Sequence, residues 1–276
     1  MNRLIFALIF VALYVVGCAQ TTNGSTGGSA NGRMFTSFSD FIGARVASEA
    51  GSVFSQFIDP VIPGVRYKYF SALSDALAAL TAGKVDAVTL DLPVAMYTVA
   101  RDPTFAIFPF VLAEDRYGFA VAKGSELGVR GNEILKKLLE TGIVCESEQL
   151  WFSADEDKKA LPKLEHRLDF DGTAGTIRYG HQSTMAPMSY YSPEAGPLGF
   201  DLDIVSRIAY EMNMNVEFVS IPSFDALLPA LASGKVNMVG GSMSITEERL
   251  RLFDFIGPYF EGGTAFLIKK SRMGES

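Results

Sequence analysis

The chain has 276 residues, of which 20% are charged and 48% hydrophobic, so it is long enough for two lobes or one large domain. The net charge is −7 and no run of Lys and Arg exceeds two residues, which argues against nucleic acid or an anionic membrane surface as a partner. The two histidines and two cysteines are too scattered for a zinc site, and we expect neither a metal nor a cofactor; they are His166, His181, Cys18 and Cys145.

Residues 1–17 have the pattern of a secretory signal peptide. Arg3 precedes an apolar run over residues 4–16, which is too short to span a bilayer comfortably. Small residues followed by Cys18 resemble the lipobox of bacterial lipoproteins, whose cysteine is diacylated. We therefore expect an exported lipoprotein, periplasmic or at the cell surface, anchored to a membrane through Cys18. An ordinary signal peptide, or an uncleaved anchor, with an incidental cysteine is the alternative.

The next segment, residues 18–35, is rich in Gly, Ser, Thr and Asn and has few apolar residues. Such a composition cannot bury enough surface to order itself, so we expect a flexible stalk. With Cys18 lipidated, Cys145 has no partner within the chain. We expect Cys145 to be a free, buried thiol without a catalytic role.

Two candidate ligand positions follow strands in the first half of the chain. An apolar strand over residues 44–47 leads to the turn Gly51-Ser52 and then to a helix, which places free helix N–H groups at a strand's carboxyl end. Asp91 follows the apolar strand 85–90 and precedes a proline-started helix. It is either a carboxylate in a ligand cleft or the N-cap of that helix, and one residue could serve both roles.

The pattern Leu-x-x-Leu-x-x-Gly-Lys-Val occurs twice, at residues 77–85 and 228–236. Each copy predicts an amphipathic helix that ends at a glycine and is followed at once by an apolar strand. The same unit in both halves predicts two α/β lobes of similar construction.

The remaining apolar segments alternate between strand and helix patterns. We expect strands at residues 67–70, 117–122, 177–180 and 216–219, and helices at residues 132–139 and 201–212. Charged residues 154–167 predict a solvated connector. The loop 185–191, rich in Met and Tyr, is either a wall of the ligand site or part of the core.

The segment 236–255 changes from a buried strand to a glycine turn and then to a helix with Thr246 as its N-cap. Arg249 is unusual there, because a cation near a helix N-terminus opposes the helix dipole by roughly 0.3–1 kcal/mol. The same helix end offers unpaired N–H groups that favour anions. The segment therefore predicts a cradle for a small anion with Arg249 as the counter-charge. The alternative is a surface Arg249 paired with Glu248 or Asp254.

The second half of the chain is similar to the amino-acid-binding class, family 3, of bacterial extracellular solute-binding proteins, which deliver ligands to ABC importers. The segments that carry this resemblance, in family order, are residues 177–180, 199–203, 224–231, 242–249 and 253–259. The first half resembles what normally comes afterwards in that family, at residues 44–52, 83–91, 117–123 and 132–151.

The resemblance implies an α/β, two-lobe periplasmic-binding-protein-like fold of type II, with a mostly parallel sheet flanked by helices in each lobe and the ligand cleft between them. The inverted order of the segments predicts a circular permutation. Residues 36–118 would be the family's second lobe and residues 119–270 its first, with residues 153–175 as the permutation linker and residues 271–276 as a tail. A fragment of a tandem array, truncated in its last half-copy, is the alternative.

The resemblance also implies the ligand contacts. Arg249 would bind the α-carboxylate, helped by the Ser244 backbone and by the Gly51-Ser52 turn of the opposite lobe. Asp91, with Ser242, would bind the α-ammonium. Because Arg249 and Asp91 belong to different lobes, a ligand that bridges them would favour lobe closure.

Three further residues concern the ligand's side chain. Phe224 would pack against its aliphatic part. Gln182 and Met185 stand where basic-amino-acid binders often carry an acid and then an aromatic residue, so we expect a neutral or polar side chain rather than a cationic one.

We therefore expect a monomeric, lipid-anchored protein that binds a free L-amino acid, or a similar small zwitterion, without turnover and delivers it to an ABC permease. A dehydratase-like enzyme on the same fold is one alternative, although the sequence has no Gly-x-Ser-x-Gly, HExxH, Walker or Gly-x-Gly-x-x-Gly motif. A ligand sensor module is the other, and it would continue past residue 270 into a transmembrane helix and an output domain.

Overall fold

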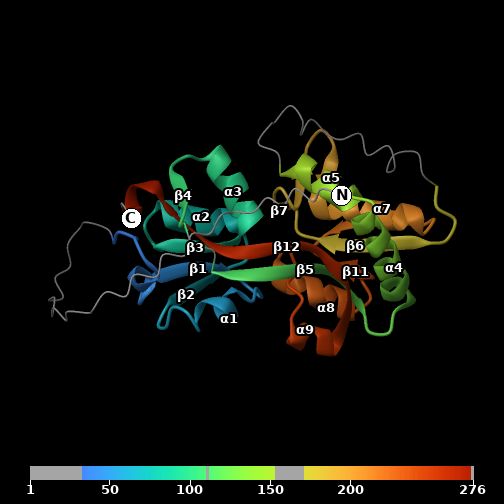
Figure 1. Cartoon of the computed structure of the whole chain (residues 1–276), viewed down its shortest axis with the longest axis horizontal. Helices are drawn as coiled ribbons and strands as arrows, with labels where there is room; N and C mark the ends of the chain where they lie inside the picture. Colours follow the sequence, from blue (N-terminus) through green and yellow to red (C-terminus); the bar gives the residue numbers. More distant parts are fainter. Residues whose placement is uncertain (1–32, 110–111, 153–170, 275–276) are drawn as a thin grey trace. The chain divides into compact units, whose positions relative to one another are not determined.

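The computed structural model describes residues 33–109, 112–152 and 171–274. Nine strands form one mixed sheet in the order β10-β6-β11-β5-β12-β3-β1-β2, with β4 paired to β12, and helices pack against both halves of this sheet (Figure 1). We name the halves after their most important residues: the Asp91 lobe contains residues 33–109 and 264–274, and the Arg249 lobe contains residues 118–152 and 171–256. The predicted α/β fold with two lobes of type II is confirmed.

Parallel strands build the Asp91 lobe. Its elements are η1 (Phe38–Phe41), β1 (Arg45–Glu49), α1 (Phe54–Ile58), β2 (Arg66–Phe70), α2 (Leu73–Thr81), β3 (Ala87–Asp91), α3 (Leu92–Arg101) and β4 (Phe105–Ile107). Strand β3 is buried along its whole length, because it lies between β1 and β12, whereas β2 is partly exposed at the sheet edge. Pro93 is the second residue of α3, in the first turn, where the helix needs no N–H donor. Asp91 occupies the N-cap position but makes no capping hydrogen bond, so its carboxylate is available for another role.

The Arg249 lobe repeats this construction. Its elements are α4 (Glu126–Glu140), α5 (Ile143–Trp151), β6 (Thr176–His181), α7 (Phe200–Glu211), β10 (Asn215–Ser220), η2 (Phe224–Ala226), α8 (Leu227–Ala232), β11 (Met238–Val239) and α9 (Glu247–Leu252). The loop rich in Met and Tyr forms a separate antiparallel sheet of β7 (Thr184–Met185), β8 (Ser189–Ser192) and β9 (Gly196–Leu198). Met188 is fully buried in the core, so at this residue the core interpretation of the loop holds.

Two long antiparallel strands run through both lobes. They are β5 (Ala113–Ala122) and β12 (Phe253–Lys269), paired from Phe253 opposite Ala122 to Thr264 opposite Ala113. At about 3.3 Å per residue, the 17 residues of β12 can reach from one sheet half to the other. The far end of β12 pairs with β3 and β4. The predicted range 119–270 is therefore too long at its end, because residues 264–269 complete the Asp91 lobe.

The first and last described residues lie side by side. The Phe35 N–H donates to the Arg272 carbonyl at 2.9 Å, and the Gly274 N–H donates to the Phe35 carbonyl at 3.0 Å. Phe35 is fully buried and stacks on Phe41. Residues 33–35, predicted as the end of the stalk, thus belong to the folded body, because Phe35 supplies core surface.

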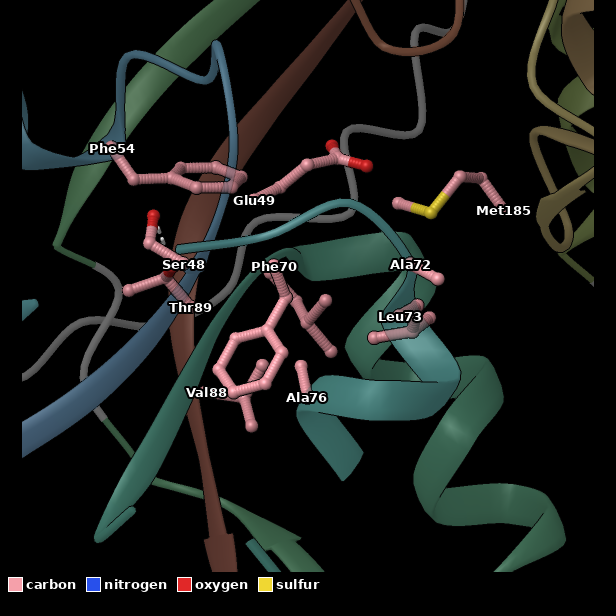
Figure 2. Close-up of a pocket in the computed structure, with 11 residues that line it drawn as sticks. Ser48, Glu49, Phe54, Phe70, Ala72, Leu73, Ala76, Val88, Thr89 and Met185 are labelled. Carbon is pink, nitrogen blue, oxygen red and sulfur yellow. Dashed lines mark hydrogen bonds between the residues drawn. The ribbon is translucent and has the colours of Figure 1, made fainter. Parts of the chain in front are cut away.

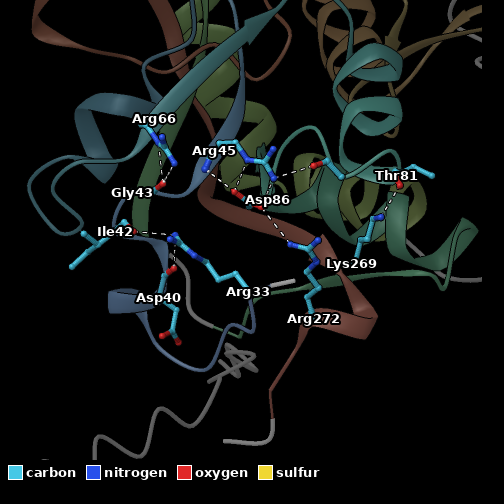
Figure 3. Close-up of polar contacts among 11 residues, drawn as sticks. Arg33, Asp40, Ile42, Gly43, Arg45, Arg66, Thr81, Asp86, Lys269 and Arg272 are labelled. Carbon is cyan, nitrogen blue, oxygen red and sulfur yellow. Dashed lines mark hydrogen bonds and ion pairs between the residues drawn. The ribbon is translucent and has the colours of Figure 1, made fainter. Parts of the chain in front are cut away.

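A cluster of charges surrounds this junction (Figure 3). The buried carboxylate of Asp86 pairs with Arg45 at 2.8 Å and with Arg272 at 3.3 Å. Arg33 donates to the carbonyls of Asp40 and Ile42, both at 3.0 Å. Burial alone would raise the pKa of Asp86, but the hydrogen bonds and charge of Arg45, with the charge of Arg272, hold this pKa below its usual value. The two ends of the described body are therefore fixed to the same lobe.

The thiol of Cys145 and the imidazole of His181 differ in exposure. Cys145 is exposed, not buried as predicted, because the inward face of α5 is formed by Val144, Ser147 and Trp151 at helical spacing and Cys145 lies outside that stripe. His181 is buried, with its Nδ1 2.8 Å from the Ser189 hydroxyl.

Several predictions lie outside the described residues: the signal peptide at residues 1–17, Cys18, His166 and most of the linker 153–175. None of the helices within residues 33–109, 112–152 and 171–274 has the length and apolar character needed to cross a bilayer.

Candidate functional site

Residues from both lobes line one small cavity at the ends of their strands. Its empty space, including the opening to solvent, is about 230 Å³. The lining residues are Glu49, Ser52, Val53, Phe54 and Asp91 from the Asp91 lobe, and Phe224, Ser242, Ser244 and Arg249 from the Arg249 lobe. The carboxyl ends of strands are where sheets of this class place ligands, so this cavity is the candidate binding site.

Arg249 reaches into the cavity from α9. It is 7% exposed, and its guanidinium donates to the Ser244 carbonyl at 2.9 Å and, across the lobes, to the Gly51 carbonyl at 3.1 Å. The guanidinium also lies 5.5 Å from the centre of the Phe224 ring. Burial lowers the pKa of Arg249, and the nearby carboxylates of Asp115, Glu248 and Asp91 oppose that change.

The surface alternative for Arg249 is wrong, because the side chain is buried and Asp254 pairs with Lys123 at 2.8 Å instead. Thr246 caps α9 as predicted, since its hydroxyl accepts from the Arg249 N–H at 3.3 Å. A guanidinium has five donors, and two of them are used by these backbone carbonyls. The group can therefore still bind an anion.

Asp91 faces the same cavity from the end of β3. It is 6% exposed and accepts a hydrogen bond from the Tyr117 hydroxyl at 2.8 Å. Burial raises the pKa of Asp91 well above its usual value, and the charges of Asp115 and Glu49 raise it further. Within the part of the chain that the structure describes, Asp91 has no ion-pair partner. A cation that entered the cavity would supply one.

The turn of residues 240–242 is held by a carboxylate that the sequence analysis missed. Asp201 accepts from the N–H groups of Gly241 at 2.9 Å and Ser242 at 3.2 Å, and from the Tyr259 hydroxyl at 2.6 Å. Burial raises the pKa of Asp201 to about 7. These bonds fix Ser242 at a φ of 52°, which few residues other than glycine adopt.

The serine hydroxyls lie behind the two charged groups. The Ser242 hydroxyl is close enough to Asp91 to offset part of the rise in the Asp91 pKa, but it meets no ordinary hydrogen-bond geometry among the described residues. The Ser244 hydroxyl donates to Asp115 at 2.5 Å. The Ser242 hydroxyl is therefore a buried group that a bound ligand could satisfy.

A second group of residues lies next to this cavity. The Gln182 side-chain amide donates to the Glu49 carboxylate across the lobes at 3.0 Å. Glu49 also lines an adjacent narrow pocket, whose empty space including the opening to solvent is about 300 Å³ and whose walls include Phe54, Phe70, Leu73 and Met185. Figure 2 shows Glu49 between the Phe54 ring and the Met185 thioether.

The structure thus brings the predicted site residues together. Those that line the cavity are Arg249, Asp91, Ser242, Ser244, Phe224 and Ser52; Gly51 is bonded to Arg249, and Gln182 and Met185 lie around Glu49. Residues missed from the sequence are Glu49, Asp115, Tyr117 and Asp201. Of these, Glu49 had a detectable signal, because it ends a strand two residues before the Gly51-Ser52 turn. Among the described residues, no group of three or more His, Cys, Asp or Glu could hold a metal ion.

Comparison with known proteins gives independent information on the family that this chain resembles. Residues 177–274 match the family described as bacterial extracellular solute-binding proteins, family 3. The chain is 34% identical over 94 residues to the L-arginine-binding protein of Pseudomonas aeruginosa, covering 34% of this chain and 36% of that protein. It is 32% identical over 146 residues to the L-glutamate/L-aspartate-binding protein of the same organism, covering 50% of this chain and 46% of that protein. The matches thus span between a third and a half of these relatives.

Among solved structures, the arginine-bound form of domain 1 from TmArgBP is 28% identical to this chain. That likeness covers 35% of this chain and 82% of the domain, with a TM-score of 0.30.

Proposed function

We propose that the chain is a member of the bacterial extracellular solute-binding proteins, family 3, whose model matches residues 177–274, and that it captures a free L-amino acid for an ABC importer. The printed names of the relatives include binders of arginine and of glutamate or aspartate. All amino acids share an α-carboxylate and an α-ammonium group, so we assign the contacts of these two groups first. The relatives also include the membrane-bound lytic murein transglycosylase F of Vibrio cholerae, which is 30% identical over 115 residues, covering 42% of this chain and 20% of that protein.

The observation that carries the proposal is one cavity with a buried guanidinium from one lobe and a buried carboxylate from the other. Arg249 and Asp91 form no ion pair with each other or with any other described residue. A zwitterion supplies the missing partner to each, its carboxylate to Arg249 and its ammonium to Asp91. The free hydroxyl of Ser242 would accept a further ammonium hydrogen, and Phe224 would cover the first carbons of the ligand.

Contacts across the lobes support a closing mechanism. Arg249 donates to Gly51 and Gln182 donates to Glu49, so the lobes touch directly at the cavity. A ligand that binds Arg249 and Asp91 at once has more favourable contacts when the lobes are together than when they are apart. Such differential affinity is what allows a ligand to shift a population toward the closed state.

A thermal-shift screen over the twenty amino acids, cystine and small peptides tests the proposal. A ligand at 100 times its dissociation constant stabilises the protein by about 2.7 kcal/mol, which for a domain of this size raises Tm by roughly 5–10 °C. No shift with any of these compounds would reject the amino-acid assignment. Product formation from a prephenate-like acid would favour a dehydratase-like enzyme instead.

We further propose that the chain is a circular permutant of the family. The ends of the described body support this, because the Gly274 N–H donates to the Phe35 carbonyl, so these two segments lie as close as consecutive parts of one chain. Opening a chain at an exposed connection is tolerated when every strand and helix is kept.

A rejoined variant tests the permutation. Gly274 would be connected to Arg33 through a short glycine linker, and the chain would be opened within residues 153–170. We expect this variant to fold with a Tm within a few degrees of the parent and to bind the same ligand in the thermal-shift screen. An insoluble or unfolded product, with the parent soluble under the same conditions, would contradict the proposed order.

Delivery and anchoring complete the proposal. The signal-like residues 1–17 and Cys18 support an exported lipoprotein, periplasmic or on the cell surface, that is held to a membrane. We propose that it acts there as a monomer beside its permease. Incorporation of a labelled palmitate into the expressed protein, and its loss in Cys18→Ala, would test the anchor.

A further inference from the structure

Glu49 is a carboxylate in the candidate site that an amino acid's backbone groups leave without a partner. From its position we propose that the ligand carries a second positive charge, a guanidinium or ammonium at the end of its side chain, which binds Glu49. This inference rests on the proposed amino-acid binding and names the class of amino acid. It differs from the expectation of a neutral or polar side chain, which is based on Gln182 and Met185.

The position of Glu49 is fixed by the sheet. It is the last residue of β1, which pairs in parallel with β3, the strand that ends at Asp91. Both carboxylates therefore lie at the same edge of the Asp91 lobe. Glu49 lines the cavity that contains Asp91 and Arg249 and also the adjacent apolar pocket, so it stands where the ligand's side chain would leave the first and enter the second.

The charges around Glu49 are unbalanced without a cation. The cavity lining contains two carboxylates, Glu49 and Asp91, and one guanidinium, Arg249. A bound zwitterion adds one charge of each sign and leaves that excess unchanged. Gln182 donates one hydrogen bond to Glu49 but carries no charge. The nearby Asp225 carboxylate adds a further negative charge. No described cation pairs with Glu49.

An unpaired carboxylate in such surroundings is costly to ionise. Burial accordingly raises the pKa of Glu49 to about 7, against the opposing hydrogen bond from Gln182 and with help from the charge of Asp225. A cationic ligand group removes that cost, whereas an anionic side chain would add to it. Anionic amino acids are therefore the least favoured class.

The adjacent pocket suits the rest of a cationic side chain. Its walls include Phe54, Phe70, Leu73 and Met185, which offer apolar surface to methylene groups. Lysine and arginine combine such a stem with a charged end. The stem can pack against Phe54 and Met185 while the charged end meets the Glu49 carboxylate that lies between them (Figure 2).

The test is calorimetric titration of the full chain at pH 8 with L-arginine and with L-citrulline, which has the same shape but no charge. We expect L-arginine to bind roughly 10- to 100-fold more tightly, the range for a hydrogen bond to a charged group. Glu49→Gln should bring the two affinities together. Glu217→Gln, which removes an exposed carboxylate on β10, should leave the ratio unchanged. L-lysine in place of L-arginine identifies which head group fits better.

The pH dependence in the unaltered protein is a second measurement that needs no variant. The groups that face Glu49 are Gln182, which does not titrate, and Asp225, Asp91 and Arg249, of which Asp91 affects both ligands through the shared ammonium. Lowering the pH from 8 to 5 should therefore weaken L-arginine more than L-citrulline, because the arginine complex also requires ionised Glu49.

The outcomes separate this inference from the proposed function. If L-citrulline binds as tightly as L-arginine, or if Glu49→Gln leaves their ratio as it was, the second positive charge is wrong and amino-acid binding stands. If Glu49→Gln does not fold, the pH measurement decides: affinities for L-arginine and L-citrulline that change equally between pH 8 and pH 5 would overturn the second positive charge. If no amino acid binds at all, the proposed function itself fails.

Discussion

Replacing Arg249 with alanine should weaken ligand binding by roughly 30-fold to several thousand-fold and abolish the ligand-induced rise in Tm. The guanidinium is buried, and no other cation lines the cavity among the described residues. Truncating one partner of a desolvated, hydrogen-bonded charge pair costs about 2–5 kcal/mol or more, partly because the other charge is left unpaired. The ligand carboxylate would be that charge. Titration calorimetry with the best ligand of the thermal-shift screen measures the loss.

Arg251→Ala is the matched control, because Arg251 lies on the same short helix and is exposed. It should leave affinity unchanged within about twofold, since exposed charges contribute little. Arg249→Lys should recover only part of the loss, because an ammonium cannot keep the bonds to Ser244 and Gly51 and still present two parallel donors. Unchanged affinity in Arg249→Ala would place the carboxylate site elsewhere.

The parts of the site that could be predicted are those with a local cause. Asp91 follows a run of apolar residues and precedes a proline, and both patterns depend only on neighbours in the chain. Arg249 stands out because a cation near the start of a helix contradicts the usual preference. The repeated helix, glycine and strand pattern similarly depends on a single turn of backbone, and it predicted two lobes.

The parts that could not be predicted depend on partners far away in the sequence. Asp201 reads as an ordinary acidic residue in the first turn of α7, yet its carboxylate is buried and holds the turn at Gly241 and Ser242. Similarly, residues 253–269 are predicted to lie with the rest of residues 119–270 in one lobe, yet the end of β12 pairs with β3 and β4 from the first half of the chain. Pairing between distant strands leaves no periodic mark in either one, so only the folded chain shows it.

The surroundings of Glu49 could not be predicted from the sequence for the same reason. A charged residue at the end of a strand is usually solvated, and nothing in its neighbours indicates that Gln182, distant in the sequence, will donate to it. The expectation of a neutral or polar side chain rests on Gln182 and Met185, and neither residue indicates the carboxylate beside them. Burial, which is set by both lobes together, is what gives Glu49 its raised pKa of about 7.

Gly51→Ala should weaken ligand binding by roughly 5- to 150-fold, because it disturbs the contact between the two lobes. A Cβ at Gly51 would lie 2.8 Å from both the Cα and the Cβ of Asp225 in the Arg249 lobe, so the backbone itself would have to move. Overpacking of this kind costs about 1–3 kcal/mol. The displacement would also strain the bond from Arg249 to the Gly51 carbonyl. Calorimetry gives the affinity, and small-angle scattering with saturating ligand shows whether the lobes still close.

Alanine at Gly51 has a second effect, backbone strain, which must be separated from the clash. Gly51 has a φ of +78°, where an L-residue costs roughly 1–2 kcal/mol. Gly43→Ala isolates that cost, because Gly43 has a φ of +68° in the same lobe and a Cβ there would meet nothing within 4 Å. Both variants should lose stability through this strain, but only Gly51→Ala should also lose affinity. Equal affinities would show that ligand binding does not require the lobes to meet at Gly51 and Asp225.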